Sequence, residues 1–501
     1  MKEIYLDAAA SEVRAVAAGL LASGCRLTAT FAEDRTAMEA CFYVYYVFEQ
    51  PGDPRYLLVR TPVAASRPVF PSLAAEIPAV NWQDREIQDW FGLTAEGHPN
   101  PRRVALHDNW PDVHPLRKTF SMDTVLPPLE GERHLFRPTL GEGVFQIPVG
   151  PIHAGIIEPG HFNFAVAGEP ILYLQLRMFY VHKGIEKRFE QLSVNRAVYL
   201  AESISGDSSF SHGAAFCQAI EQAADAEIPE RAKRMRTILL ELERIYNHVA
   251  DIGAIATDVG FVIANAHASR LREMILCENE ELTGSRLLRG MVCPGGLRRD
   301  WQWDQVEHLS AVLRKFEREF SDLMRIIETS DSTRDRLERT GILHPEKARD
   351  LGIVGVAGRA SGVNRDVRRD HPYAAYDSIA LQVPVYQEGD VLRRLQVRVD
   401  EVRQSLGLIR SMIAGLQPGN ARVALPPLPP DRCALAAVEG WRGEILHWIR
   451  TGPENRLERC KIKDPSLNNW PALVEAVQGN IVPDFPVINK SFNLSYSGTD
   501  R

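Results

Sequence analysis

The sequence has no closely spaced cysteines. Its seven cysteines are scattered over 501 residues, and no two of them form the C-x-x-C pair common in zinc and iron–sulfur sites. We therefore expect this chain to bind no metal and no iron–sulfur cluster of its own. An odd number of scattered cysteines favours reduced, mostly buried thiols in a reducing compartment.

Long apolar runs and an excess of positive charge are also missing. No uninterrupted apolar stretch is long enough to span a bilayer, and the first residues, MKEIYLD, carry acids where a signal peptide needs positive charge. The formal net charge is −7 with both signs interspersed, so nucleic acid is not an expected partner. The arginine-rich stretch 365–370 contains its own acids, which favours a solvated face or internal ion pairs over phosphate binding.

The length of the chain indicates at least two domains, because 501 residues are too many for one ordinary core. Residues 42–48 and 56–63 are aromatic and β-branched with a turn between them, which predicts a hairpin. Residues 81–92 predict a short helix that ends at a glycine. Prolines recur from residue 97 to 151, and we place the boundary near Pro127–Pro138, which gives domains 1–125 and 126–501.

Long amphipathic helices are predicted in the second domain. Apolar residues recur with helical spacing after Pro229, after Asp304 and from Leu395 to Ile413. Asp304 and Glu307 suggest a capping box at the second of these helices. Prolines at 426–430 interrupt the helical pattern, and a short β-rich tail is expected beyond them. The predicted fold class is α+β: a small N-terminal α/β domain, then a mostly helical domain with a central bundle and small β regions.

Several motifs occur in the same order as in a known family. Residues 84–99 and 114–118 (HPLRK) resemble the small α/β subunit of respiratory complex I. The second domain contains GPIH at 150–153, EPGHF at 158–162, YVHKGIEK at 180–187, GGLRRD at 295–300 and RASG at 359–362. These motifs resemble the large subunit of group 4 NiFe hydrogenases, of the formate hydrogenlyase type, and the related quinone-site subunit of complex I. The resemblance covers nearly the whole chain and implies a fusion of the two subunits.

The metal-binding motifs of that family are altered in this chain. Residues 202–212 read ESISGDSSFSH, and the similar stretch of the hydrogenases looks like E-R-x-C-G-x-C-x-x-x-H. Residues 491–501 read SFNLSYSGTDR, and the similar stretch there looks like D-P-C-x-x-C-T-E-R. The four cysteine positions hold Ser205, Ser208, Ser495 and Gly498. Nickel and iron in such a centre need soft thiolate ligands, and three serines with one glycine cannot supply them. We therefore expect no NiFe centre.

The residues that bind the quinone in the complex I subunit are also replaced in this chain. Gly206 stands at the position of the quinone-binding tyrosine and Ile157 at that of the histidine. Neither side chain can donate a hydrogen bond. Asp258 matches a carboxylate found beside that quinone site, so a quinone ligand remains possible by resemblance.

Polar residues around the altered motifs are the candidate site residues. Glu158 matches a proton-transfer carboxylate of the hydrogenases, and Arg359 matches an arginine that lines their metal pocket. We expect Glu158, Asp207 and Arg359 to lie near one another. They either serve proton transfer or form a buried ion-pair network that fills the old cavity, since buried charges must be paired. The remaining candidates for the pocket are His153, His212 and Asp370.

Two functions follow from the resemblance. In the first, the chain is the oxidoreductase component of a membrane-associated complex: electrons reach a partner's iron–sulfur cluster, and a cavity takes a small acceptor or quinone. In the second, it is a redox-silent structural module that transmits conformational or protonic coupling to a membrane arm. An open cavity favours the first, and a filled cavity favours the second. The expected partners are a small iron–sulfur subunit, a ferredoxin-like subunit and membrane antiporter-like subunits, with the chain peripheral on the cytoplasmic face of a bacterial inner membrane.

Overall fold

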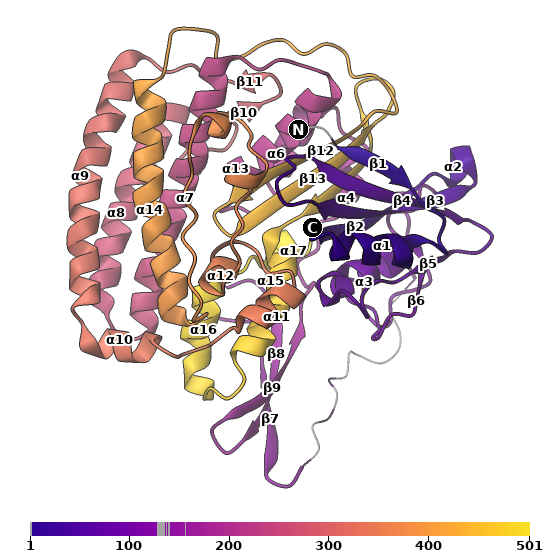
Figure 1. Ribbon diagram of the computed structural model, residues 1–501, viewed down its shortest axis with the longest axis horizontal. Helices are drawn as coiled ribbons and strands as arrows, with labels where there is room; N and C mark the ends of the chain where they lie inside the picture. Colours follow the sequence, from indigo (N-terminus) through magenta and orange to yellow (C-terminus); the bar gives the residue numbers. More distant parts are fainter. Residues whose placement is uncertain (1–2, 128–135, 137, 139–140, 156) are drawn as a thin grey trace.

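The computed structural model describes residues 3–127, 136, 138, 141–155 and 157–501. Figure 1 shows an N-terminal module of strands and short helices beside a larger part dominated by long helices. The strands of these two parts belong to separate sheets. The predicted α+β class is therefore confirmed. Most of the expected boundary near Pro127–Pro138 lies outside the described residues.

The N-terminal module is a four-stranded sheet with helices packed against it. The strand order is β1-β4-β3-β2, in which β1 and β4 are parallel and the other pairs are antiparallel. A second, two-stranded parallel sheet joins β5 to β6. The elements are β1 (Ile4–Asp7), α1 (Val13–Ala22), β2 (Arg26–Asp34), α2 (Thr36–Glu39), β3 (Cys41–Glu49), β4 (Tyr56–Ala64), β5 (Val69–Pro71), η1 (Pro78–Val80), α3 (Asn81–Phe91) and β6 (Thr94–Glu96).

The predicted hairpin and the predicted short helix both occur in this module. Strands β3 and β4 pair along their whole length, from Cys41 opposite Ala64 to Glu49 opposite Tyr56. Helix α3 ends at Gly92, whose φ of 66° lies in the left-handed region that glycine adopts without strain.

Four long helices form a bundle at one side of the second part (Figure 1). Helix α7 packs between α8 and α14, and α9 contacts both α8 and α14. Three of these helices were predicted from apolar spacing, but α8 was not, because few of its positions are large and apolar. The four are α7 (Glu230–Asp258), α8 (Val262–Thr283), α9 (Trp303–Glu328) and α14 (Val391–Ala414).

The predicted capping box of α9 is wrong by one half-turn. The helix begins at Trp303, and the reciprocal side-chain bonds are made by Gln302 and Gln305 rather than by Asp304 and Glu307. The Gln305 side chain accepts from the backbone N–H of Gln302 at 3.0 Å. Asp304 lies inside the first turn, where its negative charge still suits the helix dipole.

The region after the bundle contains more helix than expected. Three antiparallel strands, β12 (Cys433–Gly440), β13 (Gly443–Thr451) and β14 (Leu457–Lys463), form the predicted β-rich tail. Helices α15 (Pro465–Ala476), α16 (Phe485–Phe492) and α17 (Tyr496–Thr499) then follow. The prediction missed these helices, of which α17 has only four residues.

Shorter elements connect these layers. The three-stranded sheet β7-β8-β9 projects below the body in Figure 1. Helix α6 lies against β12 and β13. The bounds are β7 (Val144–Val149), β8 (His161–Ala167), β9 (Ile171–Arg177), α4 (Ile185–Phe189), α5 (Val194–Ala201), α6 (Ser209–Ala223), β10 (Val292–Cys293), β11 (Gly296–Leu297), α10 (Asp331–Leu337), α11 (Pro345–Asp350), α12 (Gly355–Ala360), α13 (Val367–Asp370), η2 (Tyr376–Ser378) and η3 (Val482–Asp484).

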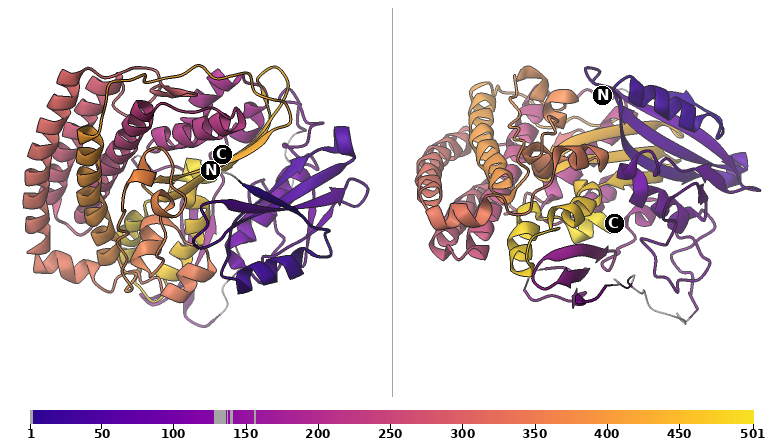
Figure 2. Two further views of the ribbon diagram at one scale, coloured as in Figure 1. Left: turned by 45° about the horizontal axis from the view of Figure 1, so that its top comes forward. Right: turned by 60° about the horizontal axis from the view of Figure 1, so that its bottom comes forward.

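The two modules share a buried interface on which β13 meets the N-terminal sheet (Figure 2). The rings of Phe31 and Tyr45 stack 4.8 Å apart, and Trp448 lies 5.0 and 5.1 Å from them. Beside these rings, Arg450 forms a fork with Glu33, at 2.5 Å from Nε to Oε1 and 2.9 Å from Nη2 to Oε2. Every residue of β13 is buried. Helix α6 packs against this strand, and Trp448 and Arg450 contact the N-terminal module.

A second charged cluster crosses the same interface. Glu444 of β13 accepts from Thr28 at 3.0 Å and pairs with Arg365 at 2.5 Å and Lys463 at 3.6 Å. Arg365 also pairs with Glu49 of β3. The side chain of Glu444 is 1% exposed, so its charge depends on these partners.

Membrane crossing and thiol state were also predicted from the sequence. Within the described ranges, no helix is both long enough and apolar enough to traverse a bilayer. All seven cysteines are free; four are buried, two are half-buried and Cys277 is exposed. The expectation of mostly buried thiols therefore holds.

The fork between Glu33 and Arg450 gives a test of the interface. Replacing Arg450 with Met leaves the buried Glu33 carboxylate without its counter-ion, and we expect this change to lower the free energy of unfolding by about 3–5 kcal/mol. The double change of Glu33→Leu with Arg450→Met should recover most of the loss. Arg55→Met, which removes a surface pair with Asp53, should cost less than about 1 kcal/mol. Urea denaturation of the four proteins measures these differences, and equal losses in Arg450→Met and Arg55→Met would contradict the assignment.

Candidate functional site

The loop before α6 and the last turn of the chain meet at one place. The Ser205 hydroxyl donates to Asp207 Oδ1 at 2.8 Å and lies 2.9 Å from the Ser495 hydroxyl. Ser208 lies at the start of α6, where its backbone N–H donates to the Ser205 carbonyl at 3.0 Å. We call Ser205, Ser208, Ser495 and Gly498 the serine site, since they occupy the positions where the resembling hydrogenases carry cysteines.

The C-terminal wall of the serine site is a single turn of helix. Ser495 caps α17, because its hydroxyl accepts from the backbone N–H of Gly498 at 2.9 Å. The preceding backbone N–H, that of Ser497, donates to Glu158 Oε2 at 3.0 Å. Glu158 is thereby held at the edge of the serine site by the backbone of α17.

The position of Gly498 has no room for a side chain. A Cβ atom built on this residue would lie 2.6 Å from Oδ2 and 3.0 Å from Oδ1 of Asp464. Asp464 is fixed in turn, because Oδ1 accepts from the backbone N–H of Ser466 at 2.7 Å and so caps α15. A carboxylate thus occupies the space into which a cysteine at position 498 would extend.

Two buried histidines lie behind that carboxylate. Nε2 of His212 lies 3.1 Å from Oδ2 of Asp464, and Nδ1 of His212 lies 3.1 Å from Nε2 of His447. Burial by itself raises the pKa of Asp464, but hydrogen bonding and charge from His212, with help from Arg442, hold it below its usual range. Burial and the neighbouring His212 hold the pKa of His447 well below its usual value, which favours the neutral ring.

Asp207 is paired with an arginine from the turn between β12 and β13. Nη1 of Arg442 lies 2.8 Å from Oδ1 of Asp207, and Nη2 lies 2.6 Å from Oδ2. Partial burial acts to raise the pKa of Asp207, but Arg442 outweighs it and the pKa stays below its ordinary range. The Asp207 side chain is 40% exposed and that of Arg442 5% exposed, so the pair closes the serine site from the solvent side as an ionised fork.

Helix α7 holds the loop in place. The Glu243 carboxylate accepts from the backbone N–H groups of Phe210 at 2.8 Å and Ser211 at 3.1 Å, which are unpaired donors in the first turn of α6. Asn247, one turn further along α7, donates to the Asp207 carbonyl at 2.8 Å. Burial raises the pKa of Glu243 to about 7, and the charge of Asp207 adds to this effect.

These contacts do not fit a NiFe centre. Such a centre needs four thiolates directed at one point, whereas here hydroxyls bond to each other, a carboxylate lies at the position of the fourth ligand, and an ion pair covers the opening. In addition, no group of three or more His, Cys, Asp or Glu side chains that could hold a metal occurs among the described residues.

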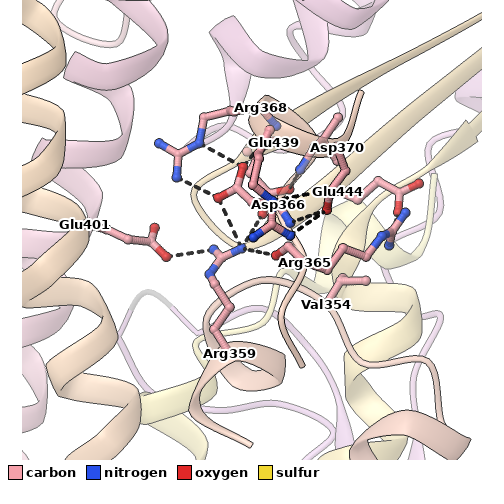
Figure 3. A network of polar contacts seen from close by, with 12 residues as sticks. Val354, Arg359, Arg365, Asp366, Arg368, Asp370, Glu401, Glu439 and Glu444 are labelled. Atoms are coloured by element: carbon pink, nitrogen blue, oxygen red, sulfur yellow. Dashed lines mark hydrogen bonds and ion pairs between the residues drawn. The ribbon is translucent and has the colours of Figure 1, made fainter. Parts of the chain in front are cut away.

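Arg359 does not join Glu158 and Asp207 as expected. Figure 3 shows its guanidinium between Glu401 at 2.7 Å, Glu439 at 2.9 Å and Asp366 at 3.5 Å. Burial by itself lowers the pKa of Arg359, but these carboxylates raise it above its usual value. Arg442 takes the place beside Asp207 that we expected Arg359 to hold.

The other three candidate residues also lie outside the serine site. The His153 ring lies 2.7 Å from the Gly160 carbonyl and braces the loop between β7 and β8. Asp258 is exposed at the end of α7. Asp370 pairs with Arg369 at 2.7 Å and accepts from the backbone N–H of Asp366, close to the Arg359 cluster.

Sequence reasoning missed three residues that shape this site. Arg442 lies in a turn between two strands, Asp464 follows β14, and Glu243 lies inside the apolar stripe of α7. Asp464 gave a usable signal, since an aspartate that directly precedes a proline suggests the N-cap of a helix. Glu243 stands out only as a charged residue within an apolar stripe. Arg442 gave none, because its partner is more than 200 positions away.

The crowded glycine gives a second test. Gly498→Ala forces the Asp464 carboxylate to move and disturbs its bonds to His212 and Ser466, so we expect a loss of about 1–3 kcal/mol in the free energy of unfolding. Gly407→Ala is the matched control, because a Cβ at this half-buried position of α14 meets nothing within 4 Å, and it should be neutral or slightly stabilising. Thermal and urea unfolding measure both, and a Gly498→Ala protein as stable as the control would show that Asp464 does not fill this space.

Comparisons with known proteins agree with the geometry of both modules. Residues 6–125 match the family described as "Respiratory-chain NADH dehydrogenase, 30 Kd subunit", and residues 258–431 and 426–501 match "Respiratory-chain NADH dehydrogenase, 49 Kd subunit". The chain is 36% identical to formate hydrogenlyase subunit 5 of Escherichia coli over 95% of its own length and 84% of the relative.

Two further relatives extend the comparison. The chain is 31% identical to the C/D subunit of NADH-quinone oxidoreductase from Phocaeicola vulgatus, over 91% of this chain and 92% of that one. Among solved structures, a chain of the membrane-bound sulfane sulfur reductase, described as an archaeal respiratory membrane complex, superposes with a TM-score of 0.68 at 26% identity, covering 73% of this chain and all of that one. The chain belongs to the family of complex I and group 4 hydrogenase large subunits, in the form fused to the complex I 30 Kd module, and carries serines and glycine at the metal-ligand positions.

Proposed function

We propose that this chain is a metal-free large subunit of a membrane-associated complex related to complex I and the group 4 hydrogenases, and that it acts as a coupling module without a reaction centre of its own. The observation that carries this proposal is the closure of the serine site. The Ser205 and Ser495 hydroxyls are satisfied by each other and by Asp207, and Asp464 and Arg442 fill the space around them. A substrate would have to displace a buried network of charge-assisted bonds.

The proposed partners follow from family membership. They are a small iron–sulfur subunit, a ferredoxin-like subunit and membrane antiporter-like subunits, with this chain peripheral on the cytoplasmic face of a bacterial inner membrane. In this proposal electrons reach the partner's cluster and go no further into this chain. The joint between the modules supports a mechanical role, because the ion pairs of Arg450 with Glu33 and of Arg365 with Glu49 tie the N-terminal module to the larger part.

Purification of the intact complex tests the partners and the missing metal together. After mild solubilisation of membranes, affinity capture of the tagged chain should recover an iron–sulfur subunit and membrane proteins, identified by mass spectrometry. Elemental analysis should find iron only in the amount that the partner clusters require, and nickel far below one atom per chain. Stoichiometric nickel, or recovery of the chain only as a free monomer, would refute the proposal.

A cavity elsewhere in the molecule supports a second candidate function. It has a volume of about 320 Å³ and lies between the modules, where aromatic residues and the 180–187 motif line it. That volume is at the lower end of ligand-binding cavities, so it supports an oxidoreductase in which a small acceptor or quinone binds beside the partner's cluster. Its aromatic lining is formed by Trp90, Trp110, Phe120 and Phe179.

The Glu158→Gln variant tests whether the serine site takes part in proton transfer. A glutamine oxygen can still accept from the Ser497 N–H, so assembly of the complex should be retained. If the serine site performs no proton chemistry, electron-transfer turnover of the purified complex should stay within about twofold of wild type. If Glu158 passes protons, turnover should fall by about 10²-fold or more. The larger loss in a fully assembled complex would exclude the coupling-only proposal.

A further inference from the structure

Three arginines line a second cavity between the modules. This cavity has a volume of about 300 Å³ and is lined by Arg85 from α3, Arg102 from the loop after β6 and Arg177 from the end of β9. Asn81 and Asn100 add amide groups to the same wall. No acceptor or metal of the proposed function has been assigned to it.

Two of these guanidinium groups are buried and converge on one strap of backbone. Arg85 donates to the carbonyls of Arg102 at 2.6 Å and Arg103 at 2.9 Å. Arg177 donates to the carbonyls of Arg103 and Val104 at 3.3 Å and of Leu106 at 2.9 Å. Arg85 is 9% exposed and Arg177 8% exposed, and both reach the same carbonyl of Arg103.

Within the described part of the chain, no carboxylate lies within ion-pair distance of Arg85, Arg102 or Arg177. Asp89 is turned to the other side of the strap, where its Oδ2 accepts from the backbone N–H groups of residues 104–106. Glu475 is the acidic residue of the lining, and it pairs with Lys347 at 3.8 Å. The strap therefore separates the carboxylate of Asp89 from the two buried cations.

This arrangement is electrostatically unsatisfied. A buried cation ordinarily has a counter-ion, since carbonyl dipoles replace its hydration only in part. Burial lowers the pKa of Arg85 to about 10; Arg177 and Arg102 add to this effect, and Asp89 and Asp108 oppose it. A bound anion would remove the repulsion between the guanidinium groups.

We propose that this cavity binds a small soluble anion that carries a phosphate group. A phosphate offers oxygens in three directions and so can accept from three guanidinium groups at once, whereas a carboxylate has two oxygens in one plane. Nη1 of Arg85 and Nε of Arg177 make no bond to a described residue and are available as donors. Trp82, Tyr173 and Phe179 in the lining give an apolar surface for a small organic body.

Binding would connect the two modules through the ligand. Arg85 and Arg102 belong to the N-terminal module and Arg177 to the second part, and the strap between them is held by both. The ligand would therefore stabilise the assembled form of the chain by mass action. This site is independent of the proposed function, because its test depends on binding and not on turnover.

The test uses the full chain with inorganic phosphate and phenyl phosphate as probes. Isothermal titration at constant ionic strength, with chloride as the competing anion, should show saturable binding at one site, and phosphate should raise the midpoint of thermal unfolding above that in chloride. Arg102→Gln should weaken binding by at least about tenfold without loss of structure, because the Arg102 side chain makes no hydrogen bond or ion pair with a described residue. Arg177→Gln should weaken it similarly if the variant folds.

The control is Arg67→Gln, which removes the same charge from the exposed surface of the N-terminal module outside the cavity. Its affinity should stay within about twofold of wild type. Tighter binding of phenyl phosphate than of inorganic phosphate would identify an organic phosphate as the ligand class. Binding only to vesicles that contain phosphatidic acid would refute the soluble ligand and indicate a lipid headgroup. Equal behaviour in phosphate and chloride, or unchanged affinity in Arg102→Gln, would overturn the site.

Discussion

Pairing of charges that have been removed from water is the constraint on which the rest of this structure depends. Two ion pairs cross the interface between the modules, Glu33 with Arg450 and Glu49 with Arg365, and Glu444 and Lys463 complete the second cluster from the side of the larger part. Such pairs add little net stability compared with apolar packing, but each becomes very costly when one partner is lost. Separation of the two modules would take Arg450 away from Glu33 and Arg365 away from Glu49, which opposes relative movement of the modules.

The same constraint explains how the serine site differs from the metal site that the related hydrogenases have at these positions. Without thiolates and metal, the remaining polar groups must satisfy one another. Hydroxyls pair across the loop and the chain end, Asp207 takes Arg442, and Asp464 takes His212. Each substitution is small, yet together they replace an open ligand set by a closed hydrogen-bond network. The family fold is retained because its helices and sheets do not depend on the ligands.

Much of the fold could be predicted from local sequence pattern. The β3–β4 hairpin, α3, α7, α9 and α14 follow from periodicity and from stop signals such as Gly92, because each depends on residues close in sequence. Helix α8 could not be predicted, since its buried side is narrow and partly made of alanine. At the site, motif matching identified the serine positions, but the partner of Asp207 and the true partners of Arg359 depend on contacts between distant segments.

Helix α7 links features that lie far apart in the molecule. Its 29 residues span about 43 Å. From one face Glu243 and Asn247 hold the serine loop, and from another His248 bonds to Glu401 of α14 at 2.8 Å. The helix ends beside Val262 and Ile263, which are 62% and 75% exposed. Because a helix of this length is stiff, a displacement of its exposed end would move the serine loop and the carboxylates around Arg359 together.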